Sequence, residues 1–518
     1  MLFVIRRDLY RQQSDMERYV VTCVKILTNG AWFLCCLCAS LVFFACSEDN
    51  EPKEVPPPVN PPAGEEPEFN IEDIEDTYPD LAPFELHPQW GPYNVHDPSI
   101  IKEGDYFYCF STDAGFGIDV RLGIQIRKSK DLVEWKFEGW VFNKLPPKGA
   151  AYITASGGTP FNSLWAPYVI KVGEEFRLYY SLSSPTPRLS VIGLATSPSP
   201  EGPWTERDVV VHSSADNTVH TNAIDPTVIV DREGRHWMYY GSAWDGIYVL
   251  ELDPATGLAK IPLSRGKRIA QRGFTDARVN GNIEAAEIIY HPELDKYYLF
   301  ISYDWLQTKY NVRVGRSDSP EGPFYDFNGV DLNEEHDVVP MILAPYQFIG
   351  HGGWQGTGHC TVFEDDGQYY IAHQGRPGVN SYYMVLHVRK IFWMENGWPV
   401  VSPQRYAGIE QTPLTAGELE GTWERIVLHY QVVPGYAEEQ VSPNFQFAVS
   451  MALDEGGTID GNPDQRWSYE VGVLTLEFGD TTYKAIAERG RDWENKTESI
   501  LFSGLNQEGV AIWGKKLN

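Results

Sequence analysis

Three acidic residues and one histidine recur at matching places in this sequence. Asp97, Asp225 and Glu284 each stand at the start of a segment rich in β-branched residues, and His359 stands at the start of another. Carboxyl groups that lie close together repel one another as anions, which raises the pKa of one member and leaves it protonated. A protonated carboxyl beside an ionised one can supply a general acid and a general base at the same pH. The set therefore predicts a site for acid–base chemistry, provided that the fold brings these residues together.

A repeated pattern predicts a fold that would do so. Residues 222–246 contain a β-branched strand, a turn at Asp231–Gly234 and a second, aromatic strand, which is the pattern of a β-hairpin. At spacings of roughly 60 to 75 residues, four more hairpins of this kind begin near Asp97, Ala166, Ala285 and His359. Five such repeats are typical of an all-β fold, a five-bladed β-propeller, in which the first strand of every blade lines the central axis. These positions would then face one funnel, with Glu284 one residue ahead of its repeat position.

A simpler interpretation of the acidic positions has to be weighed against this one. Pairs such as Asp97-Pro98 and Asp225-Pro226 can begin strands without any chemical role, because aspartate favours turns and proline restricts the residue before it. The recurrence of three acids and a histidine in register favours a shared site.

The composition fits a large folded protein that does not bind polyanions. The chain has 518 residues, of which 42% are hydrophobic and 13% aromatic, so it can bury a large core. Its net charge of −29 argues against nucleic acid as a partner and suits a neutral or basic ligand. The propeller is expected over residues 89–408, and residues 415–518 alternate like the strands of a small antiparallel β-barrel or sandwich. Cys109 and Cys360 are the only cysteines beyond residue 46, so no disulfide framework is expected, although one bond between these two stays open.

Residues 1–46 are typical of a lipoprotein signal peptide. Basic residues precede an apolar run, residues 32–45, which ends at Cys46. The run is shorter than the roughly 20 residues of a membrane-spanning helix, which favours acylation of Cys46 over a transmembrane segment. Residues 47–88 are acidic and rich in proline, which predicts a tether without a core. An acidic run directly after the acylated cysteine resembles the surface-export signal of lipoproteins from the Bacteroides group, so a lipid anchor in the outer membrane is expected.

Short motifs at the ends of the repeats resemble those of glycoside hydrolase family 43. They are His96-Asp97-Pro98-Ser99, Trp165-Ala166-Pro167, Asn222-Ala223-Ile224-Asp225-Pro226, Tyr240-Gly241-Ser242, Ile283-Glu284-Ala285, Gly358-His359-Cys360 and His373-Gln374-Gly375-Arg376. The ordered set is most similar to the endo-α-1,5-L-arabinanases of that family. Because the C-terminal region also resembles the accessory domain of two-domain arabinanases, the resemblance covers nearly all of the chain beyond the tether.

The resemblance implies a role for each member of the set. Asp97 matches the general base that activates water, and Glu284 matches the general acid that protonates the leaving oxygen. Asp225 matches a third acid, which orients the general acid and tunes its pKa. His359 matches a histidine that helps to hold a hydrated calcium ion near the propeller centre. Family members invert configuration, so Asp97 and Glu284 are expected about 6.5–9.5 Å apart, which leaves room for the water.

Two positions depart from the family pattern. The acid that usually follows Trp-Ala-Pro is Tyr168 in this sequence, and Ala286-Glu287 stands where the family has proline and tyrosine. Glu287 is therefore a rival for the role of general acid, since it would point inward if its strand were bulged. The motif match favours Glu284.

Sugar-binding residues are expected near the ends of the inner strands. The candidates are Trp165, Asn222, Ala223, Ile224, Ser242, Trp244 and Arg376. Trp244 could equally serve packing. The expected partner is arabinan or an arabino-oligosaccharide, and the protein is expected to be a monomer.

Three functions compete on this evidence. The first is an endo-arabinanase with an open cleft. The second is an exo-acting α-L-arabinofuranosidase or β-xylosidase of the same family, which needs a loop that closes one end of the funnel. The third is a surface glycan-binding propeller without catalysis, which a missing acid would favour, and no acid of the set is missing.

Overall fold

A computed structural model describes residues 69–114, 120–214, 221–275, 278–435 and 440–517. The predicted signal peptide, the acylation site Cys46 and the first part of the predicted tether lie outside the described residues. The folded unit considered below begins at Asn70 and runs to the C-terminus. Among the described residues, no helix has the length and apolarity needed to cross a membrane.

Five antiparallel sheets form the propeller, and the five predicted hairpins are their inner strand pairs. Blade one contains β1 (Ser99–Glu103), β2 (Tyr106–Ser111), β3 (Gln125–Ser129) and β4 (Lys136–Trp140). Blade two contains β5 (Trp165–Val172), β6 (Glu175–Ser183), β7 (Ser190–Ser197) and β8 (Thr205–Ser213). Blade three contains β9 (Thr227–Val230), β10 (His236–Tyr240), β11 (Ile247–Leu252) and β12 (Lys267–Ala270).

The remaining two blades are blade four, with four strands, and blade five, which has two further strands beside its first strand. Blade four contains β15 (Ile283–His291), β16 (Lys296–Tyr303), β17 (Asn311–Ser317) and β18 (Met341–Leu343). Blade five contains β20 (Trp354–Asp365), β21 (Gln368–Pro377), β22 (Val385–Trp393) and β23 (Pro399–Val401), with β19 (Tyr346–Gln347) and β25 (Gln446–Phe447) added beside β20. A helix, α2 (Pro147–Ala155), packs on blade two, and a short hairpin, β13 (Phe274–Thr275) and β14 (Arg278–Val279), precedes blade four.

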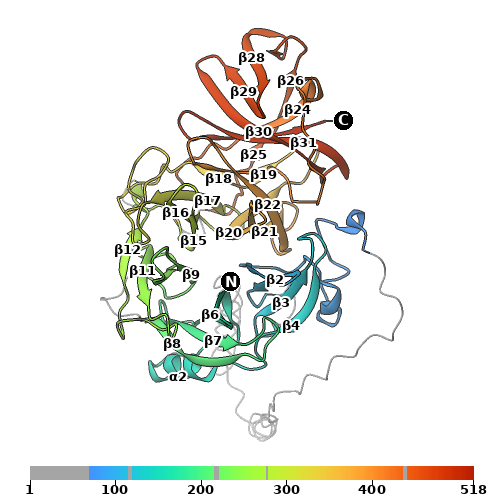
Figure 1. The fold of residues 1–518 in the computed structure, drawn as a ribbon. Helices are drawn as coiled ribbons and strands as arrows, with labels where there is room; N and C mark the ends of the chain where they lie inside the picture. Colours follow the sequence, from blue (N-terminus) through green and yellow to red (C-terminus); the bar gives the residue numbers. More distant parts are fainter. Residues whose placement is uncertain (1–68, 115–119, 215–220, 276–277, 436–439, 518) are drawn as a thin grey trace, which may run out of the picture. The chain divides into compact units, whose positions relative to one another are not determined.

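The first strands of neighbouring blades touch around the whole ring. Strands β1, β5, β9, β15 and β20 contact one another in that order, and β20 contacts β1. Figure 1 labels β9, β15 and β20 toward the middle of the ring, with later strands such as β11, β12, β7 and β8 farther out. The predicted five-bladed propeller is thus confirmed.

One backbone conformation marks the repeat in every blade. Asp97, Ala166, Asp225, Ala285 and His359 have φ angles of 52°, 38°, 59°, 56° and 50°. Residues other than glycine seldom adopt this left-handed conformation, and they keep it only where the surrounding structure enforces it. The ladder is also bulged across this position in blades two, four and five. The positions that the sequence pattern aligned are therefore equivalent in three dimensions.

A segment from before blade one closes the ring. Tyr93 forms an antiparallel bridge with Val385 of β22, and the N–H of Leu386 donates to the carbonyl of Pro92 at 2.8 Å. Blade five is in this way held to the chain that leads into blade one.

Residues 70–88 belong to the folded unit, so the prediction of a tether is wrong for this stretch. They contain the short 3₁₀ helices η1 (Ile71–Asp73) and η2, which spans Phe84–Gln89. Tyr78 is only 3% exposed, and its hydroxyl accepts the N–H of Met384 at 3.0 Å. The buried aromatic ring provides the apolar contact that the acidic composition of residues 47–88 does not suggest. We call residues 70–90 the N-terminal strap.

The C-terminal domain is a closed antiparallel barrel, which decides between the barrel and the sandwich left open by the sequence. Its strands are β24 (Gly421–Val427), β26 (Val449–Leu453), β27 (Thr458–Ile459), β28 (Asn462–Glu470), β29 (Val473–Phe478), β30 (Thr481–Asp492), β31 (Thr497–Asn506) and β32 (Ala511–Lys516). A one-turn helix, α3 (Ala416–Leu419), precedes them and begins with a capping box formed by Thr415 and Glu418. Side chains such as Trp423, Leu476 and Phe502 fill the interior.

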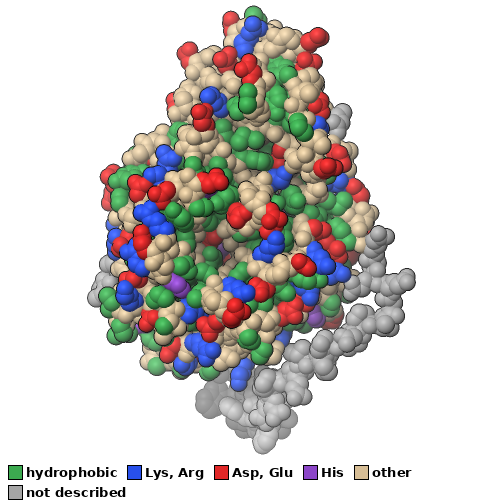
Figure 2. All heavy atoms as spheres, viewed as in Figure 1, with side chains coloured by type: hydrophobic (Ala, Val, Ile, Leu, Met, Phe, Trp, Pro, Cys, Tyr) green, Lys and Arg blue, Asp and Glu red, His purple; other side chains and the backbone are tan. Residues whose placement is uncertain are grey.

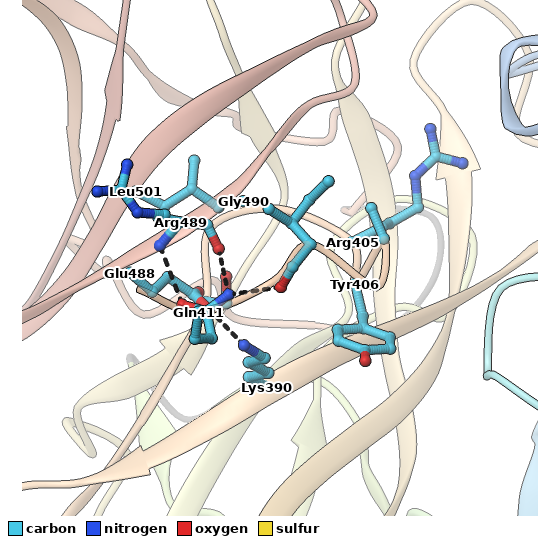
Figure 3. Close-up of a pocket in the computed structure, with 11 residues that line it drawn as sticks. Lys390, Arg405, Tyr406, Gln411, Glu488, Arg489, Gly490 and Leu501 are labelled. Atoms are coloured by element: carbon cyan, nitrogen blue, oxygen red, sulfur yellow. Dashed lines mark hydrogen bonds and ion pairs between the residues drawn. The ribbon is translucent and has the colours of Figure 1, made fainter. Parts of the chain in front are cut away.

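The barrel is joined to blade five through polar contacts. Lys390 of β22 lies 3.2 Å from Glu488 of β30, and both side chains are largely buried. Gln411, in the connection between the domains, exchanges hydrogen bonds of 2.8 and 3.1 Å with the backbone of Arg489 (Figure 3). Because a buried ion pair is costly to separate, these contacts fix the barrel against the blade. On the face drawn in Figure 2, acidic side chains are spread over the surface with basic ones among them, in keeping with the net charge of −29.

Candidate active site

One end of the ring collects the four residues that could do chemistry. In an antiparallel hairpin, the start of the first strand lies beside the end of the second, as Ser99 lies opposite Phe110 in blade one. The residues that precede each first strand therefore share one mouth with the loops that follow each second strand. Asp97 and Asp225 precede β1 and β9, Glu284 is the second residue of β15, and His359 stands at the bulge within β20. All four meet at this mouth.

Asp97 is a buried carboxylate held between two histidines. Its Oδ1 lies 2.9 Å from Nδ1 of His359, its Oδ2 lies 2.9 Å from Nδ1 of His96, and the hydroxyl of Thr112 donates to Oδ2 at 2.6 Å. Burial raises the pKa of Asp97, but the charges and hydrogen bonds of His359 and His96 outweigh it and hold the pKa well below 3.8. Asp97 is therefore ionised and able to accept a proton.

His359 carries the compensating charge. Burial lowers its pKa, whereas the carboxylates of Asp97 and Asp225 raise it, and the result is a pKa of about 9. Its backbone N–H donates to the hydroxyl of Ser302 at 2.8 Å, which fixes the left-handed residue against blade four.

Glu284 receives a hydrogen bond on each carboxyl oxygen. The hydroxyl of Ser242 donates to Oε2 at 2.6 Å, and the hydroxyl of Tyr310 donates to Oε1. Burial raises the pKa of Glu284 above 4.5, and the two hydroxyl donors oppose that rise without cancelling it. Glu284 is thus a fixed carboxyl that keeps a proton more readily than an exposed one.

Asp225 stands beside Glu284 and repels its negative form. Its Oδ2 accepts the N–H of Ala285 at 3.2 Å, and its own N–H donates to the hydroxyl of Ser181 at 3.1 Å. Burial, with the negative charges of Glu284 and Asp97, raises the pKa of Asp225 to about 8 against the opposing charge of His359. At neutral pH the two neighbours therefore hold at least one proton between them, opposite an ionised Asp97. This is the division of protonation that acid–base catalysis needs.

Glu287 lies on the same strand but makes different contacts. The bulge between Glu284 and Glu287 puts both side chains on one face of β15, as a bulge was expected to do. Glu287 accepts hydrogen bonds of 3.0 Å from the hydroxyl of Thr227 in blade three and from the N–H of Val362 in blade five. It is 2% exposed, and burial raises its pKa to about 8. Its hydrogen bonds link β15 to β9 and to β20, the first strands of the two neighbouring blades.

The two departures from the family pattern are neighbours in space. The hydroxyl of Tyr168 forms a hydrogen bond with Thr227, which also binds Glu287, and the charge of Glu287 contributes to the raised pKa of Tyr168. An acid is usual in blade two and a tyrosine in blade four of the resembled family, so this chain has the pair with the blades exchanged.

Three of the predicted sugar-binding residues make polar contacts at the site. Ser242 binds Glu284, and the charge of Asp97 acts on Arg376, which is 4% exposed and donates from Nη1 to the carbonyl of Ser381 at 2.5 Å. Asn222 pairs with Ser242, and its Oδ1 accepts the hydroxyl of Ser190 at 2.7 Å.

The other predicted sugar-binding residues differ in exposure. Ala223 is fully buried and Ile224 is 8% exposed, so their side chains offer little surface to a ligand. Trp165 is half-buried and donates from its indole N–H to the hydroxyl of Ser163 at 3.0 Å. Trp244 is 55% exposed with a φ of 49°, and the guanidinium of Arg188 lies 5.4 Å from its ring centroid. A bulky residue in this strained conformation with an exposed ring favours contact with a ligand over packing.

Sequence reasoning missed several residues of the site. His96 and Gln374 stand in the quoted motifs, and Gln374 accepts the N–H of Asp97 through its Oε1 at 3.2 Å. Thr112 directly follows β2 and Tyr310 directly precedes β17, and neither stands in a repeated motif. Only the rule that both strand ends share one mouth could have indicated them.

The metal prediction can be compared with the donors present. In the described part of the chain, no three His, Cys, Asp or Glu side chains gather as a metal-binding group. Cys109 and Cys360 are both free and buried, so the disulfide that the sequence left open is not formed.

Comparisons with known proteins agree with this geometry. Residues 91–399 match glycosyl hydrolases family 43, and residues 403–514 match a C-terminal lipocalin-like domain. An extracellular endo-α-(1→5)-L-arabinanase of Thermotoga petrophila is 32% identical over 81% of this chain and 93% of the relative. An extracellular exo-α-(1→5)-L-arabinofuranosidase of Cellvibrio japonicus is 30% identical over 60% of this chain and 86% of the relative. The crystal structure of an endo-1,5-α-L-arabinanase from Thermotoga petrophila superposes with a TM-score of 0.69 at 29% identity, over 83% of this chain and 99% of that one. The propeller, its axial acids and these matches together show that the chain belongs to family 43 of the glycosyl hydrolases.

Proposed function

We propose that the protein hydrolyses internal α-1,5-L-arabinofuranosidic bonds of arabinan. The observation that carries the proposal is the unequal protonation of three carboxyls at one mouth. Asp97 is ionised between two histidines, whereas burial raises the pKa of both Glu284 and Asp225, so that these two neighbours hold at least one proton between them.

The mechanism uses one water and these side chains. Asp97 accepts a proton from the water as its oxygen attacks the anomeric carbon, and Glu284 gives a proton to the leaving oxygen. The attack comes from the face opposite the leaving group, so the configuration at that carbon inverts. Asp225 is the neighbour proposed to tune the pKa of Glu284: the two carboxyls repel each other as anions, so the pair retains a proton for the leaving oxygen, while Ser242 and Tyr310 hold the carboxyl of Glu284 in place.

Endo action is supported by the Thermotoga relative, which is named an endo-arabinanase and aligns with 81% of this chain, a share that includes both the propeller and the C-terminal domain. The test is the size of the products over time from linear, debranched and branched arabinan. We expect a ladder of oligosaccharides before arabinose appears.

Arabinose as the first and only product would favour the exo-acting α-L-arabinofuranosidase. Release of xylose from xylo-oligosaccharides would favour a β-xylosidase. No product from any of these substrates, with binding retained, would favour the glycan-binding propeller.

Sugar binding is proposed for residues around the same mouth. Trp244 offers an exposed ring face for stacking against a sugar. Arg376 and Ser242 offer polar groups beside Asp97 and Glu284, Asn222 pairs with Ser242, and Trp165 offers a half-buried ring held by Ser163.

We also propose a calcium ion beside His359. Nδ1 of His359 binds Asp97, and a metal-binding imidazole commonly has its other nitrogen held by a carboxylate in this way. Nε2 would then be the protein ligand, with water supplying the oxygen atoms that calcium prefers. A bound cation would add positive charge that favours ionised carboxylates. Because binding releases a proton from the imidazole, calcium should bind more tightly as the pH rises, which isothermal calorimetry can measure.

The location is proposed from the sequence and from relatives whose names include the word extracellular. We propose that the protein is exported and held at the outer membrane by acylation of Cys46. A Cys46→Ala variant should leave the membrane fraction, and its continued retention there would favour residues 32–45 as a membrane anchor. A monomer is expected in solution, which light scattering can test.

A further inference from the structure

A segment of the C-terminal barrel reaches the loop that supports the general acid. This barrel segment comprises residues 428–435 and 440–445, the described parts of the connection between β24 and β25. The hydroxyl of Thr308 donates to the carbonyl of Gln440 at 2.5 Å, and Nε2 of Gln440 donates to Oδ1 of Asp304 at 3.3 Å. Thr308 and Asp304 belong to the loop between β16 and β17, residues 304–310. Gln440 is fully buried by these contacts.

The same glutamine also lies against the chain that leads into Glu284. A Cβ atom on Gly281 would lie 2.2 Å from Nε2 of Gln440, and Gly281 has a φ of 69°. Any other residue at position 281 would therefore displace the glutamine side chain. Gly281 precedes Glu284 by three residues, so the side chain of Gln440 lies between the carboxylate of Asp304 in the loop and the backbone that leads to the acid.

A buried cluster of charges fixes this junction. Arg272 donates to Asp304 at 2.9 Å, to Asp337 at 2.5 Å and to the carbonyl of Asn282 at 2.9 Å. It also donates to the hydroxyl of Tyr430 in the barrel segment at 2.7 Å. Loss of one partner would leave a buried charge uncompensated, so displacement of the barrel segment would destabilise the whole cluster.

The loop transmits this position to the acid through Tyr310. The hydroxyl of Tyr310 donates to Glu284, and its carbonyl accepts the hydroxyl of Thr357 at 3.2 Å. Its ring packs so closely on Gly358 that a Cβ there would lie 2.9 Å from a ring carbon. The ring is thus held between the loop and blade five, and a shift of the loop would move the hydrogen bond on Glu284.

We propose that Gln440 and Thr308 are positioning residues for the general acid, and that the barrel completes the active site through them. The inference rests on the proposed role of Glu284. A small displacement of a catalytic group slows the chemical step more than it weakens binding. The barrel segment should therefore affect kcat, and it should do so only where the leaving group needs a proton.

The test compares two substrates that differ in that need. Linear arabinan has an alkoxide-type leaving group that must be protonated, whereas an aryl arabino-oligosaccharide with an acidic phenol leaves without help. In Gln440→Ala and Thr308→Val, kcat on arabinan should fall about tenfold, with KM little changed. The kcat on the aryl substrate should stay within about twofold of the wild type. Gln507→Ala is the matched control, because Gln507 is another glutamine of the barrel and bonds to the backbone of Thr482 and Asp480 at 3.3 and 3.2 Å, outside the barrel segment.

The possible results distinguish the positioning role of Gln440 and Thr308 from the assignment of Glu284 as the acid. Equal losses on both substrates, or no loss on either, would overturn the positioning role of Gln440 and Thr308. Glu284→Gln is measured in parallel and should show the same selective loss to a larger degree. If Glu284→Gln instead loses both activities equally, the assignment of the acid fails and the inference fails with it.

Discussion

Nδ1 of His359 lies 2.9 Å from Oδ1 of Asp97, on the side of the carboxylate opposite the contact with His96. This ion pair favours the ionised form of Asp97, the residue proposed as the base.

The first prediction is that His359→Ala loses activity without losing the fold. Alanine already occupies the equivalent left-handed position at residues 166 and 285, with φ angles of 38° and 56°, so the backbone tolerates it. We expect kcat/KM to fall about 10- to 100-fold, as for other residues that support a catalytic or metal-binding group, with a melting temperature near that of the wild type. A calcium chelator should reproduce part of this loss in the wild type.

His336→Ala serves as the control for His359→Ala. His336 lies 3.2 Å from Asp326, in another histidine–aspartate pair outside the site. Full activity of His359→Ala, with no effect of chelator, would reduce His359 to a structural residue.

The second prediction separates the two glutamates of β15. Glu284→Gln should lower kcat by about 10²- to 10⁴-fold while binding of arabino-oligosaccharides persists, because only the transferable proton is removed. Glu287→Gln should retain most activity, since Glu287 binds Thr227 and Val362 instead of facing the mouth beside Ser242. Steady-state kinetics with calorimetric binding measure both. An inactive Glu287→Gln beside an active Glu284→Gln would reverse the assignment.

The third prediction concerns the alkaline limb of the pH–rate profile. The acid must be protonated, so activity should be lost as the pH rises through the raised pKa of Glu284. Tyr310 donates to Glu284 and favours the ionised form, so Tyr310→Phe should raise that pKa and move the alkaline limb of kcat/KM to higher pH.

Tyr303→Phe is the control for that shift. The hydroxyl of Tyr303 is buried without a hydrogen-bond partner in the described structure, so its removal should leave the profile in place. A limb in Tyr310→Phe that stays where the wild type has it would argue against Glu284 as the titrating acid.

The fourth prediction is a dependence of stability on pH. Burial raises the pKa of Glu287 from 4.5 to about 8 in the folded protein. Between these values the folded state holds a proton that the unfolded chain has lost, so the free energy of unfolding should fall as the pH rises. The slope from this one group is at most about 1.4 kcal/mol per pH unit. Urea unfolding of wild type and Glu287→Gln at several pH values measures the difference, and parallel curves would show that Glu287 does not cause the slope.

The sequence predicted those parts of the fold that repeat. Asp97, Ala166, Asp225, Ala285 and His359 could be aligned because every blade needs the same hairpin, and the structure gives all five the same left-handed backbone. The sequence allowed the bulge that puts Glu287 on the same face as Glu284, but it did not predict that bulge, because no local residue pattern requires one there.

The parts that do not repeat could not be predicted in this way. Tyr310 reaches Glu284 because its loop is held by Thr308 and Gln440, which are far apart in the sequence. The acidic composition of the strap predicts a tether, because composition does not show that the ring of Tyr78 is buried against the fold.

The strap also determines the route by which tension would enter the fold. Glu72 and Glu75 of the strap bind Arg491 and Lys496 of the barrel at 2.8 and 2.7 Å, and Asp76 binds His351 at 2.6 Å. A pull on the chain upstream of Asn70 would load these ion pairs first and the bridge between Tyr93 and Val385 only afterwards. The contacts between the strap and the barrel would therefore separate before the bridge that closes the ring is loaded.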